Sequence, residues 1–200
     1  MSNVIYSYGA SLYLNLTNQC PCSCSFCIRE RTQRVGSSDS LWLETEPTPA
    51  QVIAGLEETR LASYDQIVFC GFGEPFCAFA RILEICAYLR GRAGCPPIRI
   101  NTNGLGDLIN AKPTAPLLEG LVDVISISLN APDGERYREL CNPTFGQVSF
   151  DAVLQFAADC KKHIPQVVFS VVDVLSKEEI AACQEIARQM DIPLRVRGCS

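Results

Sequence analysis

Hydrophobic and polar residues alternate in several short segments of the chain, and this pattern predicts strands. In the first segment, Leu12, Leu14 and Leu16 alternate with polar or aromatic residues. Later segments are rich in β-branched residues and are bounded by glycine, asparagine or proline, as strands commonly are. The pattern predicts six strands, at residues 12–17, 66–70, 98–102, 122–129, 166–174 and 193–197.

Apolar residues at helical spacing occupy the segments between these strands. Thr48 and Gln51 form a capping-box pattern around Pro49, which predicts the start of a helix. A second capping box begins at Ser176, and Ser149 is expected to cap the preceding helix. The predicted helices are residues 49–60, 79–89, 133–140, 149–162 and 176–190, with a less regular helical turn at 114–119.

Strands that alternate with helices predict an α/β fold with parallel strands. Strands of a doubly wound sheet are buried on both faces, whereas four of the predicted strands have one apolar and one polar face. A complete eight-unit barrel needs about 250 residues. We therefore predict an incomplete (β/α)6 TIM-like barrel with a polar lumen, and residues 1–200 as a single domain. The side chains expected in the lumen are Tyr13, Asn15, Thr17, Arg99, Asn101, Asn103, Ser126, Ser128, Asn130, Arg195 and Arg197.

The composition of the chain indicates the cellular compartment in which the protein is expected. Hydrophobic residues make up 48% and charged residues 20% of the chain, as in globular proteins. The net charge of −5 argues against a general nucleic-acid-binding surface. Neither a signal peptide nor an apolar stretch of about 20 residues, the length of a membrane span, is visible. We therefore expect a reducing cytoplasm, in which those of the twelve cysteines that lie outside the loop at residues 20–27 are buried free thiols.

Three cysteines follow the first predicted strand with the spacing C-x3-C-x2-C: Cys20, Cys24 and Cys27. A [4Fe–4S] cluster normally takes four cysteines, so a loop that supplies three leaves one iron open to another ligand. Cys22 lies among them, but a single residue between it and Cys24 suits cluster irons poorly, and we expect no ligand role for it. Two alternatives remain: a structural zinc site, and an electron-transfer cluster with Cys22 as the fourth ligand.

Glycine- or asparagine-rich breaks end the next three predicted strands. Gly-Phe-Gly-Glu-Pro occupies residues 71–75, Asn-Thr-Asn-Gly occupies 101–104, and Asn130 follows the fourth strand. The carboxyl ends of parallel barrel strands open on one rim, where active sites form. We therefore expect backbone and side-chain groups of these breaks to face a ligand together with the cysteine loop.

With these motifs in place, the chain resembles the radical SAM (S-adenosylmethionine) enzymes. CPCSCSFC fits their C-x3-C-x-aromatic-C signature, and GFGEP fits their GGEP-type motif. LNLTN ahead of the cysteines is most similar to the TatD-associated radical SAM proteins, and the resemblance covers nearly the whole chain. It implies a [4Fe–4S] cluster on Cys20, Cys24 and Cys27, with the amino and carboxylate groups of SAM on the fourth iron. Reductive cleavage of SAM would give a 5′-deoxyadenosyl radical that abstracts hydrogen from an unidentified substrate.

The resemblance also implies roles for individual residues. Gly73 and Glu74 match the positions that receive the methionine amino group, and Phe72 replaces the first glycine of the motif, its backbone serving while its ring packs outward. Phe26 would shield the cluster and lie near the adenine. The ribose and carboxylate of SAM would contact Asn101 or Asn103, and Ser128 or Asn130.

Partners are expected from the same resemblance. Reduction of the cluster implies an electron donor such as flavodoxin or ferredoxin, and no membrane partner is expected. The subfamily suggests a functional link to a TatD-type hydrolase and, by analogy, a nucleotide or nucleic-acid substrate, although the acidic net charge weighs against a polynucleotide.

Arg195 and Arg197 would bind a carboxylate or phosphate in the lumen or pair with internal acids. Arg29, Arg31 and Arg34 are expected to form a solvated surface run.

Overall fold

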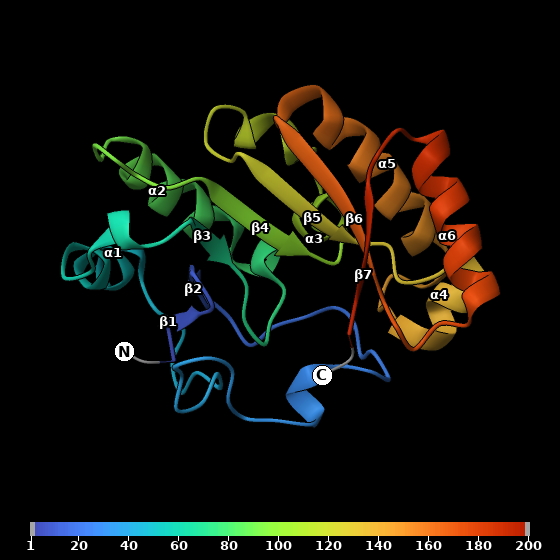
Figure 1. Cartoon of the computed structure of the whole chain (residues 1–200), viewed down its shortest axis with the longest axis horizontal. Coiled ribbons are helices and arrows are strands. Elements are labelled where there is room, and N and C mark those ends of the chain that lie inside the picture. Colours follow the sequence, from blue (N-terminus) through green and yellow to red (C-terminus); the bar gives the residue numbers. More distant parts are fainter. Residues whose placement is uncertain (1–2, 199–200) are drawn as a thin grey trace.

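The computed structural model describes residues 3–198 and shows a seven-stranded sheet whose strands follow one another in chain order (Figure 1). Strands β2 to β7 run parallel, and β1 is antiparallel to β2. The sheet is open, with β1 and β7 at its edges. The α/β fold and the incomplete, TIM-like barrel are thereby confirmed. The strands are β1 (Ile5–Tyr8), β2 (Ser11–Leu14), β3 (Gln66–Phe69), β4 (Ile98–Thr102), β5 (Val124–Ser128), β6 (Gln166–Val172) and β7 (Leu194–Arg197).

Among the described strands, β1 is the one that the sequence pattern did not predict, and the short helix at Gly106–Asn110 was not predicted either. Strand β1 has only four residues, and a tight turn at Gly9, with φ of 58°, folds it back onto β2. The loop at residues 36–38 covers its outer edge. The Ser7 N–H donates to Ser37 Oγ, and the Ser37 N–H donates to the Ser7 carbonyl, both at 2.8 Å. Hairpin and loop therefore close this side of the sheet locally.

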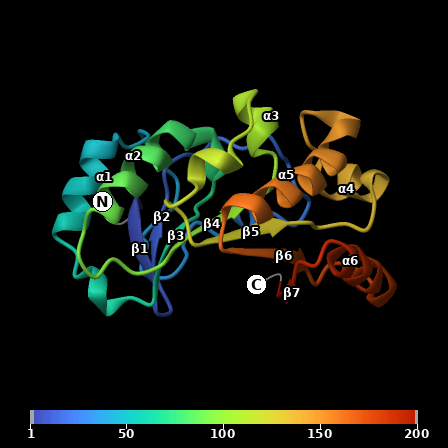
Figure 2. The same cartoon turned by 90° about the horizontal axis from the view of Figure 1, so that it is seen from above.

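Helices pack along the outer side of the curved sheet (Figure 2). They are α1 (Pro49–Glu57), α2 (Phe79–Arg90), α3 (Gly106–Asn110), α4 (Gly134–Cys141), α5 (Ser149–His163) and α6 (Lys177–Gln189). Both capping boxes, at Thr48 and Ser176, are present. The predicted cap at Ser149 is wrong, because a 3₁₀ turn at Gly146–Val148 leads straight into α5 and gives Val148 helical dihedrals at the cap position. Within residues 3–198, no helix has the length and apolar character that crossing a membrane requires.

The hydrophobic core lies between the sheet and these helices. Strand residues such as Phe69, Ile100 and Ile127 are fully buried there. Phe76 and Phe156 meet edge to face in the same layer, with ring centroids 5.3 Å apart. Burial of side chains of this size contributes about 1.5–3 kcal/mol each, so the apolar outer face of the sheet fixes the helices in place.

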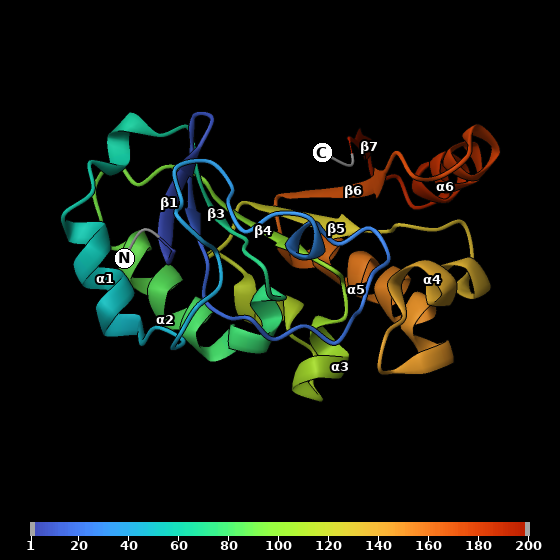
Figure 3. The same cartoon turned by 90° about the horizontal axis from the view of Figure 1, so that it is seen from below.

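The segment after β2 crosses in front of the carboxyl ends of the strands (Figure 3). Polar side chains of this segment form hydrogen bonds to residues 41–46. Asn15 Nδ2 donates to the Leu41 carbonyl at 2.7 Å, Asn18 Nδ2 donates to the Leu43 carbonyl at 2.7 Å, and Thr17 bonds to Glu46. The prediction that Asn15 and Thr17 face the lumen is therefore wrong, because both side chains anchor the segment around residues 41–46 instead.

Candidate functional site

A cavity of about 560 Å³ lies where the cysteine loop meets the carboxyl ends of the strands. One wall is the loop from Cys20 to Thr32, and another is the break after β3. The polar face of β4 to β7 forms the rest and contributes side chains that include Arg99, Ser126 and Ser170. The predicted polar lumen is thus present, and it is continuous with the rim where the motifs lie.

Nearly all of the site residues predicted from the sequence line this one cavity. They are Cys20, Cys24, Phe26, Cys27, Gly73, Glu74, Asn101, Asn103, Ser128 and Asn130. Phe72 does not line it. Its ring is buried beside Tyr6 and Leu41 and meets Trp42 edge to face, with centroids 5.2 Å apart. Residues separated by more than a hundred positions are therefore brought together, and the Phe72 ring lies outside the group.

The break after β3 packs directly against the cysteine loop. A Cβ atom on Gly73 would lie 2.3 Å from the Thr17 carbonyl oxygen and 2.7 Å from that of Gln19, so no larger residue fits without movement. The next residue makes a backbone contact across the same boundary, because the Glu74 N–H donates to the Gln19 carbonyl at 2.8 Å. Glycine at position 73 therefore sets how closely the two walls of the cavity approach.

Glu74 is the buried acid of the cavity, with 4% of its surface exposed. Its Oε1 accepts hydrogen bonds from Thr102 Oγ1 at 2.7 Å and the Phe76 N–H at 3.2 Å, and its Oε2 accepts one from the Asn103 N–H at 2.7 Å. Burial raises the pKa of Glu74 to about 7, although these three donors favour the carboxylate. Both oxygens are engaged with the protein, so the side chain joins the ends of β3 and β4.

The thiols of the loop form a connected group. Hydrogen bonding to the thiols of Cys141 and Cys22 lowers the pKa of Cys24 to about 4, and Cys22 likewise lowers the pKa of Cys20. The donating thiols of Cys22 and Cys141 have raised pKa values for the same reason. Burial raises the pKa of Cys27. Two loop cysteines thus favour the thiolate form that metal binding requires.

Helix α4 positions this loop, a contribution that the sequence did not reveal. The Ser23 N–H donates to the Cys141 carbonyl at 3.0 Å, and the Ser25 N–H donates to the Leu140 carbonyl at 2.9 Å. These carbonyl groups belong to the last turn of α4, where helical partners are lacking. The only signal available in the sequence was the apolar spacing of Tyr137, Leu140 and Cys141, which indicates a buried helix face and no more.

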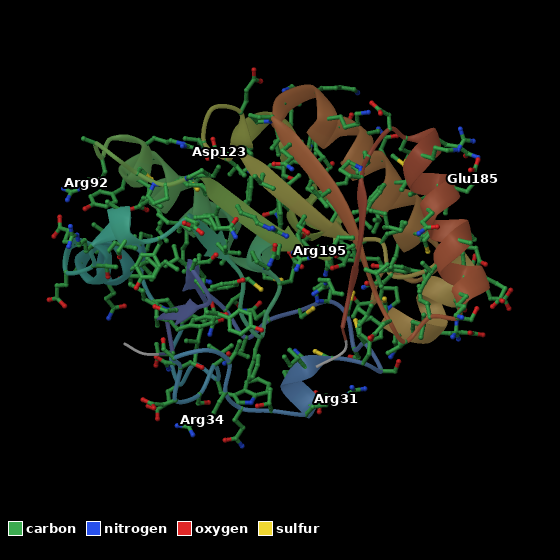
Figure 4. The ribbon with its side chains drawn as sticks, in the orientation of Figure 1. Arg31, Arg34, Arg92, Asp123, Glu185 and Arg195 are labelled. Carbon is green, nitrogen blue, oxygen red and sulfur yellow. The ribbon has the colours of Figure 1, made fainter. Side chains whose placement is uncertain are left out.

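The predicted surface run of arginines divides into different environments. Arg34 is exposed, with 72% of its side chain accessible, and pairs with Asp39 at 3.8 Å. Arg31 lines the cavity, and Figure 4 shows it beside the cysteine loop. Only 18% of the Arg29 side chain is exposed, and its charge adds to the effect of the neighbouring thiols on Cys24. The prediction of a solvated run is therefore wrong for Arg29, which lies in the 3₁₀ turn at Ile28–Glu30, whereas Arg31 is exposed at the margin of the cavity.

The donor set suits an iron–sulfur cluster better than a single metal ion. Among residues 3–198, no three histidine, cysteine or acidic side chains converge as one bound ion would require. A cluster distributes its thiolate ligands over separate irons, so its cysteines need only line a common wall, as Cys20, Cys24 and Cys27 do. The soft thiol donors are also those that iron–sulfur clusters select.

Asn130 shows that the cavity also suits a polar ligand. The residue is 6% exposed and adopts a left-handed backbone conformation, with φ of 59°. Its Nδ2 donates to Cys141 Sγ at 3.7 Å, while its Oδ1 is buried without a hydrogen-bond partner among the described residues. Buried acceptors are normally satisfied, so this oxygen in the cavity wall fits a ligand that carries a hydroxyl or amino donor.

Comparisons with known proteins find structures of the same fold. The chain resembles the structure of Streptococcus suis SuiB bound to S-adenosylmethionine, with a TM-score of 0.67 and 16% identity over 97% of this chain and 40% of SuiB. It also resembles HydG, a maturase of the [FeFe]-hydrogenase, with a TM-score of 0.67 and 14% identity over 100% of this chain and 45% of HydG. A radical SAM methyltransferase from Sphaerobacter thermophilus gives a TM-score of 0.52 and 20% identity, over 97% of this chain and 68% of that protein.

These identities establish a shared fold, and the chain spans less than half the length of SuiB and of HydG. None of the curated proteins compared with the chain matches it. The family model described as the Radical SAM superfamily matches residues 14–190, which is most of the sequence. The chain therefore belongs to the radical SAM superfamily of enzymes, whose cofactors are a [4Fe–4S] cluster and S-adenosylmethionine.

Proposed function

We propose that the chain holds a [4Fe–4S] cluster on Cys20, Cys24 and Cys27 and binds S-adenosylmethionine beside it. The observation that carries this proposal is that these three thiols share one cavity with the residues of the other three motifs. The chemistry that the bound cofactors supply is reductive cleavage of S-adenosylmethionine to methionine and a 5′-deoxyadenosyl radical, which takes a hydrogen atom from a substrate.

In this proposal the break after β3 receives the methionine amino group. Gly73 brings its backbone against the cysteine loop, and both Gly73 and Glu74 line the cavity. Glu74 acts as a positioning residue, because its oxygens already accept hydrogen bonds from Thr102, Asn103 and Phe76. Phe72 contributes only backbone, since its ring packs elsewhere.

The polar residues at the ends of β4 and β5 bind the remainder of S-adenosylmethionine. Asn130 supplies an unsatisfied buried acceptor suited to a ribose hydroxyl, and Ser128 lies in the same cavity wall. Asn101 and Asn103 line the adjoining wall. Phe26 lies on the cysteine loop, where it shields the cluster and contacts the adenine.

The proposal extends to organisation and partners. Residues 1–200 act as a single radical SAM core domain in the cytoplasm, with an electron donor such as flavodoxin or ferredoxin. Assignment to the TatD-associated group, and with it a functional link to a TatD-type hydrolase, is supported by the LNLTN segment ahead of the cysteines. The family model is that of the whole superfamily and does not bear on this finer assignment.

A second candidate is a non-catalytic electron-transfer protein in which Cys22 is the fourth cluster ligand. The observation in its favour is that Cys22 lines the same cavity and interacts with both Cys20 and Cys24. The two candidates differ in whether S-adenosylmethionine can reach the cluster.

Anaerobic reconstitution with iron and sulfide, followed by S-adenosylmethionine and dithionite, separates them. Formation of 5′-deoxyadenosine that depends on Cys20, Cys24 and Cys27 is the expected result. A stable cluster whose spectrum is unchanged by S-adenosylmethionine, with no 5′-deoxyadenosine, would favour electron transfer instead. Zinc in place of iron would contradict both candidates.

A further inference from the structure

Three arginines lie on the polar face of the sheet, away from the cysteine loop in the sequence. Arg99 is in the middle of β4, and Arg195 and Arg197 are on β7. The register places Arg195 beside Ser170 of β6, and Ser170 beside Ser128 of β5, so these side chains share the face of the sheet that lines the cavity. In the view of Figure 4, Arg195 lies on the edge strand β7 in front of the sheet, whereas Arg92 and Glu185 lie at the periphery of the view.

These arginines are close enough to act on one another. Burial lowers the pKa of Arg99, and the positive charges of Arg195 and Arg197 lower it further, whereas Tyr13 acts in the opposite direction. Arg99 and Arg195 both act on Tyr13 as well, which locates them around the same part of the lumen. This positive group is notable in a chain whose net charge is −5.

The acid that lines the cavity, Glu74, does not pair with Arg99 or Arg195. Arg99 Nε donates to Asn101 Oδ1 at 2.8 Å, which is a neutral acceptor. Within residues 3–198, neither Arg99 nor Arg195 forms an ion pair with a carboxylate. Glu74, the acid in the cavity wall, has both oxygens occupied by other donors. Pairing with internal acids, the alternative open from the sequence, therefore does not describe Arg99 and Arg195.

We propose that Arg99 and Arg195, with Arg197 beside them, bind an oxyanion group of the substrate, either a carboxylate or a phosphate. Arg99 is half-buried and has no carboxylate partner among the described residues, which is unfavourable for a guanidinium, and an anion that enters the lumen reduces that penalty. Arg195 and Arg197 are exposed on the edge strand and add positive charge to the same face of the sheet. The planar donors of arginine match the oxygens of both groups and bind them in a fixed orientation. A positive lumen in an acidic protein also concentrates anions at the site.

This inference deepens the proposed function and rests on it, because it names the chemical class of the substrate from which the 5′-deoxyadenosyl radical would take a hydrogen atom. The carboxylate of S-adenosylmethionine is the competing occupant. Arg99 differs in position along the sheet from the residues assigned to S-adenosylmethionine, because it precedes Asn101 and Asn103 on β4. Arg195 is level with Ser170 and Ser128, near the strand ends, so the two occupants must be separated by measurement. The experiment must therefore distinguish an added anion from S-adenosylmethionine itself.

Arginine footprinting with phenylglyoxal on the reconstituted full chain tests the proposal residue by residue. Adducts are mapped by mass spectrometry in the presence of inorganic phosphate, acetate, S-adenosylmethionine or no addition. Phosphate or acetate is expected to slow modification of Arg99 and Arg195 about tenfold, and the more effective anion identifies the phosphate or carboxylate class. Arg92, which lies over the Tyr88 ring at 5.8 Å and outside the cavity, should be modified at the same rate throughout.

Protection of Arg99 and Arg195 by S-adenosylmethionine alone, or by neither anion, would overturn the proposal. The double variant Arg99→Gln/Arg195→Gln should weaken phosphate or acetate binding at least tenfold in equilibrium dialysis, whereas Arg92→Gln should leave it unchanged. Because the footprint is read on the unmutated protein, a variant that fails to fold does not decide the outcome. Production of 5′-deoxyadenosine is measured separately, so failure of the radical chemistry and failure of anion binding are distinguishable.

Discussion

The carboxylate of Glu74 accepts a hydrogen bond from the Asn103 N–H at 2.7 Å and thereby joins the end of β3 to the end of β4. Its other oxygen accepts from Thr102 Oγ1 on the same strand and from Phe76 in the turn that follows. One buried side chain thus fixes the relative positions of the two breaks that follow the neighbouring strands β3 and β4 in the cavity wall.

Replacement of Glu74 by alanine should destabilise the protein by about 2–4 kcal/mol. Two backbone N–H groups and the Thr102 hydroxyl would lose their acceptor in a buried environment, and unsatisfied buried donors are strongly unfavourable. Chemical denaturation of the metal-free protein measures the effect. Glu84→Ala is the matched control, because Glu84 is exposed on α2 and should change stability little. Equal losses in the two variants would contradict the assigned role.

The stability of the metal-free protein should depend on pH through the same residue. The folded state binds the Glu74 proton more tightly than the unfolded chain, since burial raises its pKa from 4.5 to about 7. The free energy of unfolding should therefore fall as pH rises from 4.5 to about 7, by roughly 3 kcal/mol in total. The difference between the natural protein and Glu74→Gln across this range isolates the contribution, and a constant difference would exclude it.

Replacement of Gly73 by alanine should separate the two walls of the cavity. The added Cβ would lie 2.3 Å from the Thr17 carbonyl oxygen, so the segment that leads into Cys20 must move. We expect a loss of about 1–3 kcal/mol in stability and reduced iron content after reconstitution. In Gly134→Ala the new Cβ meets Phe150 at 3.6 Å, an ordinary contact, and that variant should match the natural protein in both measurements. Full iron loading of Gly73→Ala would show that the approach of the walls is not critical.

The cysteines of the loop should differ sharply in iron binding. Cys24→Ala is expected to abolish cluster assembly while leaving a folded protein, as judged by iron analysis and circular dichroism. Cys22→Ala should retain its iron, because the resemblance assigns the three irons to the other cysteines. Normal iron content in Cys24→Ala would refute the ligand assignment. Loss of iron in Cys22→Ala would instead favour the electron-transfer candidate.

Much of the fold was predictable because most elements obey local rules. The alternation of apolar and polar residues located the six parallel strands, and the capping boxes at Thr48 and Ser176 marked two helix starts. Strand β1 escaped prediction because four residues carry too little periodicity, and its position depends on pairing with β2 and on the loop at Ser37. Ser149 has the chemistry of a cap, but the 3₁₀ turn before it leaves no extended cap position to fill.

Some residues of the candidate site could likewise be predicted from the sequence, and others could not. Residues at chain breaks, such as Gly73, Asn103 and Asn130, could be predicted because glycine and asparagine are common where strands end. Cys70 and Ser170 also line the cavity, yet they lie in apolar patterns where nothing local distinguishes them. Their contribution depends on the curvature of the whole sheet, which brings separate strands around one space. Hydrogen bonds between distant segments, such as those from the cysteine loop to α4, likewise cannot be predicted from the spacing of residues in the sequence.

The two edges of the sheet are unequal, and this should appear in their local dynamics. The outer edge of β1 exchanges hydrogen bonds with Ser37 in both directions, whereas no strand among the described residues pairs with the outer edge of β7. Backbone amides open more readily where fewer neighbours hold them. Hydrogen–deuterium exchange should therefore be faster in β7 than in β1. That flank carries Arg195 and Arg197, so transient opening there would admit bulky molecules to the lumen without disturbing the cysteine loop.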